Sequence, residues 1–194
     1  MASENGEKVN LDLGINDVPG TKKSKKDWVL LALRVLAFLA TVSATLVMAL
    51  NKQTKSLVVP TIGSTSITVN LTAKFQHTPA FVFFVIANGI ASLHNLVMIA
   101  LDILQPQFDY KGVRLALIPI SDMIITAVAS AGDGGATFMS ELGRHGNSHA
   151  RWDKICDKFE AYCNRGGGAL IASFIGIILL LIITGMSITK LLKP

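Results

Sequence analysis

Apolar residues along this chain are gathered into four long blocks instead of being spread at amphipathic spacing. The blocks cover Trp28–Leu50, Pro79–Leu104, Val113–Ala131 and Gly166–Leu192. Because a helix rises ~1.5 Å per residue, about 20 apolar residues cross a hydrocarbon core ~30 Å thick. The pattern therefore predicts an all-α membrane protein, a bundle of four transmembrane helices joined by connections too short for a separate soluble domain.

Polar stretches precede and separate the first blocks. Residues 1–27 carry scattered glycines and a proline with little periodicity, which is typical of a disordered tail. Residues 51–78 form a first loop in which Lys55–Val59 and Thr65–Leu71 alternate enough to allow two short strands. Asn70 begins the tripeptide Asn-Leu-Thr, an N-glycosylation sequon that supports an outside location only weakly.

A longer loop, residues 132–165, separates the last two blocks. It opens with Gly132–Gly135, which we interpret as a turn. Within Arg151–Cys163 four apolar side chains recur at helical spacing: Trp152, Ile155, Phe159 and Tyr162. This spacing predicts a short amphipathic helix that lies against the bundle or the membrane surface, within a small extracellular loop subdomain.

Composition and charge add a topology to this picture. Only 16% of the residues are charged, against roughly 25% in soluble domains, and 51% are hydrophobic. The net charge of +5 comes largely from a cluster directly before the first block: Lys22, Lys23, Lys25 and Lys26. Lysines beside a span tend to stay cytoplasmic, so we expect both termini inside and both loops outside. The cluster lacks interleaved aromatics, and we expect no nucleic-acid partner.

Two charges inside the apolar blocks are the main candidate site. Asp122 lies near the centre of the third block, where a carboxylate costs several kcal/mol unless it is paired, neutralised or facing water. Arg34 is the one charge in the first block. It either snorkels to the headgroups or pairs with Asp122, and the lone acid favours pairing. Thr126 and Ser130 extend Asp122 into a polar stripe at four-residue spacing.

Smaller polar signals mark the second and fourth blocks. The middle of the second block carries Asn88, Ser92, His94 and Asn95. One interpretation is a pore or a proton relay built from His94; the one we favour is hydrogen bonding between packed helices. The fourth block has small residues at four-residue spacing, Gly168, Ala172 and Gly176. These favour close helix packing, either inside the bundle or between subunits.

The two cysteines, Cys156 and Cys163, share the second loop. Two cysteines in one extracellular loop are more often bridged than free. In an unbroken helix their Cα atoms would lie ~10 Å apart, beyond the ~7 Å limit, so a disulfide requires the helix to bend or end before Cys163. No nucleophile–base pair, metal-ligand cluster or nucleotide motif is present, and we expect neither enzymatic activity nor a cofactor or metal.

This constellation resembles a plant family. An Arg in the first span, an Asp in the third and a cysteine pair before the fourth are similar to the Casparian strip membrane domain proteins, more closely to their CASP-like relatives, which are related to the four-span MARVEL proteins. The most specific stretches are TPAFVFFVIANGIASLHNL (Thr78–Leu96) and AGDGGATFMSELGRHGNSHARWDKICDKFEAYCNR (Ala131–Arg165), and the resemblance runs from about Lys25 to the C-terminus. The first outside loop lacks the acidic-aromatic signature of the founding members.

The resemblance implies a multi-pass plasma-membrane protein that self-associates into scaffolds. It implies homo-oligomers and hetero-oligomers with related members, contacts with membrane lipids, and cell-wall-modifying enzymes as partners. The alternative is a small transporter or channel, with Asp122, His94 and Asn88 lining a polar path.

Overall fold

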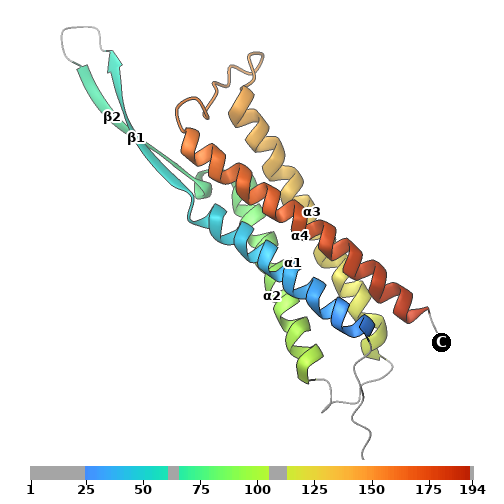
Figure 1. The fold of residues 1–194 in the computed structure, drawn as a ribbon. Helices are drawn as coiled ribbons and strands as arrows, with labels where there is room; N and C mark the ends of the chain where they lie inside the picture. The colour runs from blue at the N-terminus through green and yellow to red at the C-terminus, as the bar shows by residue number, and fades with distance from the viewer. Residues whose placement is uncertain (1–24, 61–65, 105–112, 193–194) are drawn as a thin grey trace, which may run out of the picture.

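The computed structural model describes residues 25–60, 66–104 and 113–192. Four long helices lie side by side, and each is long and apolar enough to cross a membrane (Figure 1). They are α1 (Lys25–Ala49), α2 (Pro79–Leu104), α3 (Val113–His145) and α4 (Glu160–Leu191). The predicted four-helix membrane bundle is confirmed. The predicted disordered tail lies outside the described residues.

The helices pack as a closed ring. α1 packs against α2 and α4, and α3 packs against the same two helices, so α1 and α3 face each other across the diagonal. Neighbouring helices run antiparallel. The end of α1, the start of α2, the end of α3 and the start of α4 therefore share one end of the bundle, from which a β-hairpin projects (Figure 1). We call this the hairpin end.

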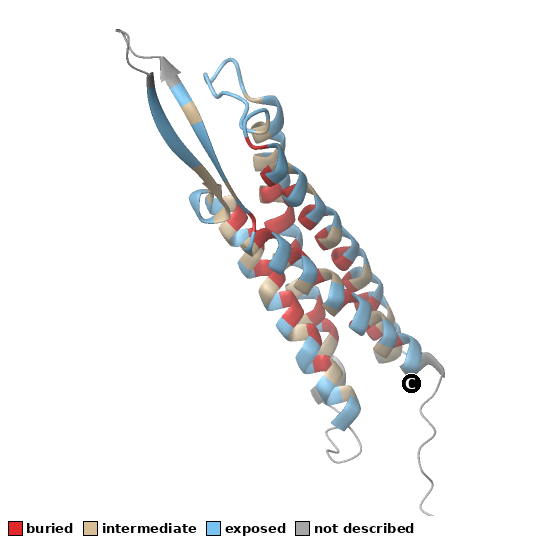
Figure 2. Cartoon of the chain, turned by 60° about the vertical axis from the view of Figure 1, so that its left-hand side comes forward, coloured by how far each residue is buried: buried red, intermediate tan, exposed pale blue. Residues whose placement is uncertain are grey.

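In every helix one series of buried positions alternates at three and four residues, and we call this series the core seam (Figure 2). Further buried residues, such as Ala87, Gly132 and Ile177, lie beside it. In α1 and α3 it consists of Leu30, Arg34, Ala37, Thr41, Ala44, Met48, Pro119, Asp122, Thr126, Ala129, Asp133 and Ala136. In α2 and α4 it consists of Phe81, Phe84, Asn88, Ala91, Asn95, Met98, Tyr162, Gly166, Ala169, Ser173, Gly176, Leu180, Ile183 and Ser187. This spacing averages 3.5 residues, as in four-helix bundles with knobs-into-holes packing.

The third and fourth helices are longer than their apolar blocks. With 33 and 32 residues, α3 and α4 measure roughly 50 and 48 Å, so both extend past a ~30 Å hydrocarbon core. The turn predicted at Gly132–Gly135 is wrong, because α3 continues through it. A Cβ at Gly132 would lie 2.9 Å from the Cβ of Ala87, so this glycine serves close packing against α2.

The helix predicted within Arg151–Cys163 is also wrong. α3 ends at His145, and Gly146 follows with φ +67° and donates its N–H to Leu142 O (2.8 Å), a left-handed helix cap. The chain then runs irregularly up to Phe159, and α4 begins at Glu160. The backbone nitrogens of Ile155 and Cys156 both donate to Gly143 O, which folds this segment back onto α3.

Only half of the apolar pattern in that segment is buried. Phe159 and Tyr162 join the core, whereas Trp152 and Ile155 are 55% and 50% exposed. The helical spacing therefore does not reflect one continuous helix: the buried pair packs into the core at the start of α4, and the exposed pair lies in the irregular loop before it.

The first loop forms an antiparallel hairpin of β1 (Lys52–Pro60) and β2 (Ser66–Lys74), followed by the 3₁₀ turn η1 (Phe75–His77). Both strands contain most of the predicted ones and are longer. Cross-strand side-chain bonds join Thr54 to Thr72 and Ser56 to Asn70 on one face. Asn70 is exposed there; its glycosylation stays a prediction.

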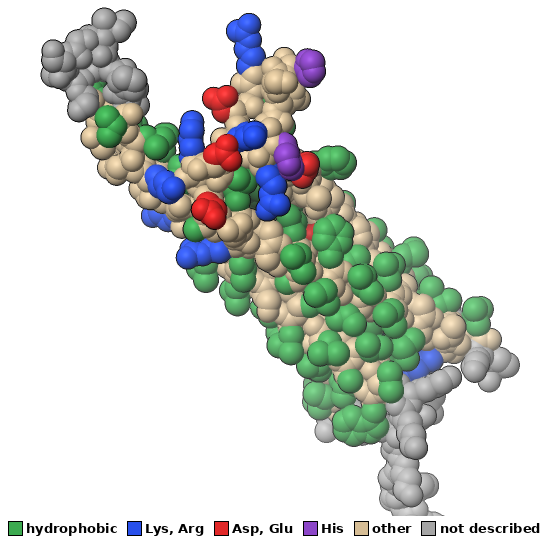
Figure 3. Space-filling view, turned by 45° about the horizontal axis from the view of Figure 1, so that its top comes forward, with side chains coloured by type: hydrophobic (Ala, Val, Ile, Leu, Met, Phe, Trp, Pro, Cys, Tyr) green, Lys and Arg blue, Asp and Glu red, His purple; other side chains and the backbone are tan. Residues whose placement is uncertain are grey.

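Charged side chains gather around the hairpin and the loop before α4, while hydrophobic side chains cover the flank of the bundle (Figure 3). Exposed flank residues include Leu93, Met123, Ile171 and Leu181, each more than half exposed. An apolar flank below a charged end is typical of a bundle surrounded by lipid.

Candidate functional site

The core of the bundle contains a buried ion pair between its two diagonal helices. Arg34 on α1 donates from Nη1 and Nη2 to the two carboxylate oxygens of Asp122 on α3, at 3.1 and 2.8 Å. The side chains are 1% and 0% exposed. The structure thus brings together the two charges singled out in the sequence. The two-pronged geometry is the strong form of an Arg–carboxylate contact.

His94 and Ser187 complete the cluster. His94 Nε2 on α2 lies 2.8 Å from Asp122 Oδ1, and Ser187 Oγ on α4 lies 3.5 Å from Oδ2. Each of the other three helices therefore contributes one side chain to the Asp122 carboxylate of α3. Because Asp122 accepts from Arg34 as a carboxylate, Nε2 is the donor in the contact with His94. Ser187 gave no signal in the sequence, since a lone serine on an apolar helix has many uses.

A second carboxylate lies close to Arg34. Asp102 Oδ2, near the end of α2, is 3.9 Å from Arg34 Nε and its side chain is 23% exposed. Arg34 Nε has no hydrogen-bond partner within the described residues. Arg34 therefore sits between a fully buried acid and a partly exposed one, and both hold its charge in place.

Most other polar side chains in the core bond to their own helix. Thr126 donates to Asp122 O at 2.7 Å, and Asn95 donates to Ala91 O at 2.9 Å. Ser130, the last residue of the predicted stripe, is exposed and donates to Thr126 O at 2.8 Å. Ser92 likewise donates to Gly89 O. The two hydroxyl groups of the predicted stripe on α3 therefore bond to backbone carbonyls of α3 itself.

A second polar layer lies nearer the hairpin end. Ser173 on α4 donates to Asn88 Oδ1 on α2 at 2.8 Å, a contact between helices of the kind we favoured for the second span. Asp133 on α3 is 1% exposed, and neither of its carboxylate oxygens has a hydrogen-bond partner among the described residues. Asp133 escaped the sequence interpretation because it falls within the predicted turn.

The three small residues of the fourth span have different surroundings. A Cβ at Gly176 would meet Thr41 Cγ2 at 2.9 Å, so α1 and α4 approach closely there. A Cβ at Gly168 would meet nothing within 4 Å, and Ala172 is half-buried. The core seam explains the difference, because Gly176 lies on it and the other two do not.

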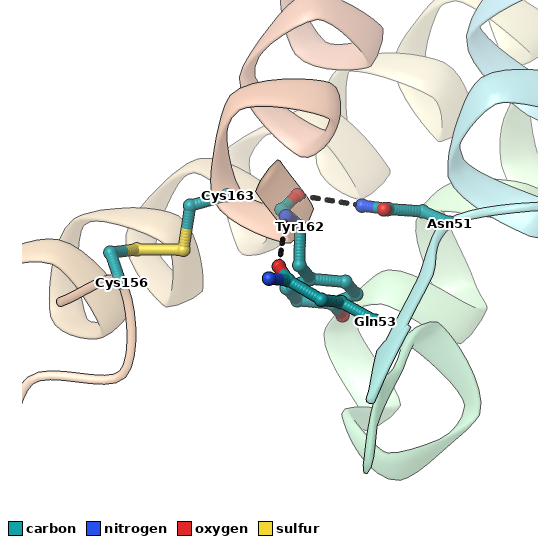
Figure 4. The surroundings of a disulfide bond; sticks show 5 residues. All are labelled: Asn51, Gln53, Cys156, Tyr162 and Cys163. Atoms are coloured by element: carbon teal, nitrogen blue, oxygen red, sulfur yellow. Dashed lines mark hydrogen bonds between the residues drawn. A yellow bond between two sulfur atoms is a disulfide. The ribbon is translucent and has the colours of Figure 1, made fainter. Parts of the chain in front are cut away.

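A disulfide joins Cys156 to Cys163, with the Cα atoms 5.6 Å apart. The separation of ~10 Å expected in an unbroken helix does not apply, because α4 begins at Glu160, between the two cysteines. Beside it, the backbone of Tyr162 is held by Asn51, in the connection between α1 and β1, and by Gln53 of the hairpin (Figure 4). Asn51 Nδ2 donates to Tyr162 O, and Tyr162 N donates to Gln53 Oε1, both at 2.8 Å. Sequence patterns contain no signal for such contacts between distant residues.

Replacing both cysteines by serine should loosen the start of α4 without unfolding the bundle. The loop that the bridge closes is short, so loop-closure entropy contributes about 2.5 kcal/mol. Hydrogen exchange measured by mass spectrometry should show faster exchange over residues 156–165 and unchanged exchange over 176–187. Equal acceleration in both segments would mean that the bridge supports the whole bundle.

Among the described residues, no group of three or more His, Cys, Asp or Glu side chains is placed to hold an ion. His145, one of two histidines four residues apart, instead contacts Glu141 at 2.8 Å on the exposed end of α3.

Comparison with known proteins fits this architecture. Residues 23–179 match the family model described as the Casparian strip membrane protein domain. The chain is 68% identical to CASP-like protein 1B1 of Glycine max over 193 residues, covering 100% of this chain and 98% of that protein. It is 54% identical to CASP-like protein 1B2 of Arabidopsis thaliana over 173 residues, covering 89% and 87%. No solved structure matches. The chain therefore belongs to the CASP-like family of plant membrane proteins.

Proposed function

We propose that this chain is an oligomeric scaffold of the plasma membrane, with both termini in the cytoplasm and the hairpin end outside. It assembles with copies of itself and with related family members, and it recruits cell-wall-modifying enzymes. Support comes from membership of a family whose name refers to the Casparian strip membrane. The lysine cluster directly before the first apolar block supports the orientation.

The observation that carries the proposal is that Arg34 and Asp122, the two charges singled out in the spans, bind each other in the core. Asp122 is 0% exposed and is held by Arg34 and His94, so in this conformation it does not face water. Proton or ion transport that uses Asp122 would need water or a substrate to reach its carboxylate. A bundle whose interior is closed acts through its outer surfaces, which suits a scaffold.

The ion pair has a definite role in such a scaffold. A buried pair adds little net stability, because desolvation offsets the attraction, but it can specify one arrangement of helices. Here the pair and His94 fix the relative heights of α1, α2 and α3. The outer surfaces that meet neighbouring copies then keep one shape.

Fluorescence recovery after photobleaching tests self-association. We expect a C-terminally tagged chain in a plant plasma membrane to form patches that recover slowly or not at all. A lipid-anchored marker in the same cells should recover fully. Fast and complete recovery, both alone and after co-expression of a related family member, would contradict the scaffold.

The transporter alternative makes the opposite prediction in a reconstituted system. Ion or solute flux into vesicles that Asp122→Asn abolishes, in a correctly folded protein, would replace the scaffold proposal with transport.

A further inference from the structure

A pocket of about 690 Å³ lies at the hairpin end, between α3, α4, the base of β2 and the disulfide loop. It falls in the size range of small-molecule sites. Apolar and aromatic side chains form much of its wall, among them Met48, Phe81, Phe159, Tyr162 and Leu170. The four side chains of the buried charge cluster, Arg34, His94, Asp122 and Ser187, do not line this pocket.

The pocket is elongated along α4. Its lining residues recur on one face of this helix from Tyr162 to Phe174, a rise of ~18 Å. One membrane leaflet contributes ~15 Å of hydrocarbon, half of the ~30 Å core. The pocket therefore has the length of a single lipid chain that lies parallel to the helix.

Its lower end opens toward the membrane. Ile171 and Phe174 line the pocket and are also 64% and 46% exposed on the apolar flank of the bundle. A lipid in the adjoining leaflet can enter between these side chains without crossing the charged end of the molecule.

Glycine keeps the pocket open on the α4 side. Gly167 lines it, and a Cβ built there would meet nothing within 4 Å. Glycine is a poor helix former, and no close contact requires it at this position. Gly166, one residue earlier, has a different role because its Cβ position approaches Asn51 and Met48.

The upper end of the pocket is cationic. Lys74 on β2 and Arg144 in the last turn of α3 both line it, together with His77. Glu141 lines it as well, but its carboxylate contacts His145 Nδ1 at 2.8 Å. Lysine and arginine are the side chains best suited to a phosphate group, and they lie where headgroups meet water.

We propose that this pocket holds one acyl chain of a phospholipid from the leaflet on the hairpin side, with the lipid's phosphate bound by Lys74 and Arg144. The acyl chain moves into the pocket from a bilayer that is equally apolar, so the hydrophobic effect contributes little to binding. Affinity comes from the two cations, and the shape of the pocket selects a chain. The bound lipid joins the hairpin to α3 and α4.

Photolabelling of the full-length protein tests the proposal. The protein is reconstituted in phosphatidylcholine vesicles that contain a small fraction of phosphatidylcholine with a diazirine in the acyl chain. Labelled residues are mapped by peptide mass spectrometry after irradiation. We expect adducts on Tyr162 and Leu170, which are each 7% exposed and out of reach of bulk lipid. Leu181, 57% exposed on the flank, provides the bulk-lipid reference.

Two matched pairs of variants decide the outcome. Gly167→Leu fills the pocket and should lower labelling of Tyr162 and Leu170, relative to Leu181, at least fivefold. Gly168→Leu adds the same side chain at an exposed neighbouring position with equal space and should change it less than twofold. The second pair tests the two cations. The double change Lys74→Gln and Arg144→Gln should also lower the labelling of Tyr162 and Leu170, relative to Leu181, at least fivefold. Lys52→Gln, at the cross-strand partner of Lys74, should leave this ratio unchanged.

Labelling confined to Leu181 in the wild type would overturn the proposal, as would equal ratios in Gly167→Leu and Gly168→Leu. Adducts from a photoreactive sterol but not from the phospholipid would also overturn it. If neither lipid labels the pocket and chemical cross-links instead join Tyr162 to a second copy, the pocket is a subunit contact.

Discussion

Replacing Asp122 by alanine should lower the yield of folded protein more than any other single change in the core. Arg34 would keep its charge at 1% exposure, with Asp102 at 3.9 Å as the remaining carboxylate near it. Removing one partner of a buried pair costs about 3–5 kcal/mol, because the other charge stays desolvated. Fluorescence-detected size-exclusion chromatography of the tagged protein should show loss of most of the monodisperse peak.

Three companion variants give this result its meaning. Asp133→Asn changes another buried acid of α3 that has no hydrogen-bond partner among the described residues, and it should keep or raise the yield. Arg34→Met combined with Asp122→Leu removes both charges and should recover much of the peak. The charge-swapped double variant should recover part of it. A swap no better than either single change would show that direct pairing is not what the bundle requires.

The ion pair could be anticipated because charge is scarce in apolar blocks. Each charge inside a span needs a partner. The first span has one basic residue and the third has one central acid, so few pairings were possible. The remaining members of the cluster are common residue types. His94 had several interpretations, and Ser187 had none, because a serine bonds to its own helix as readily as to a neighbour.

Helix boundaries on the hairpin side were predicted less well than the spans themselves. An apolar run indicates which part of a helix lies in the hydrocarbon core of the membrane. The helices α3 and α4 continue beyond their apolar runs. Gly132–Gly135 indicated a turn because glycine disfavours helices locally. Packing against α2 through Gly132, and continuation of the core seam through Ala136, outweigh that preference.

Gly176→Leu should destabilise the bundle most among the small-residue changes. Its Cβ would lie 2.9 Å from Thr41 Cγ2 and 3.5 Å from Ala40 Cβ, before the rest of the side chain is added. Overpacking costs typically 1–3 kcal/mol, and a leucine at this crossing should reach the upper part of that range, about 3 kcal/mol. Thermal denaturation in mild detergent should show a Tm lower by several degrees.

Gly185→Leu is the matched control on the same helix. Its Cβ position is free of contacts within 4 Å and the residue is exposed on the flank, so a leucine there should keep or raise the Tm. Gly168→Leu should behave like this control, although Gly168 shares the four-residue spacing of Gly176. If Gly168→Leu instead leaves the Tm intact but breaks up oligomers, then small residues of the fourth span join subunits as well as helices. If Gly176→Leu is as stable as Gly185→Leu, α1 and α4 do not need their close approach, and the core cluster alone determines how the helices align.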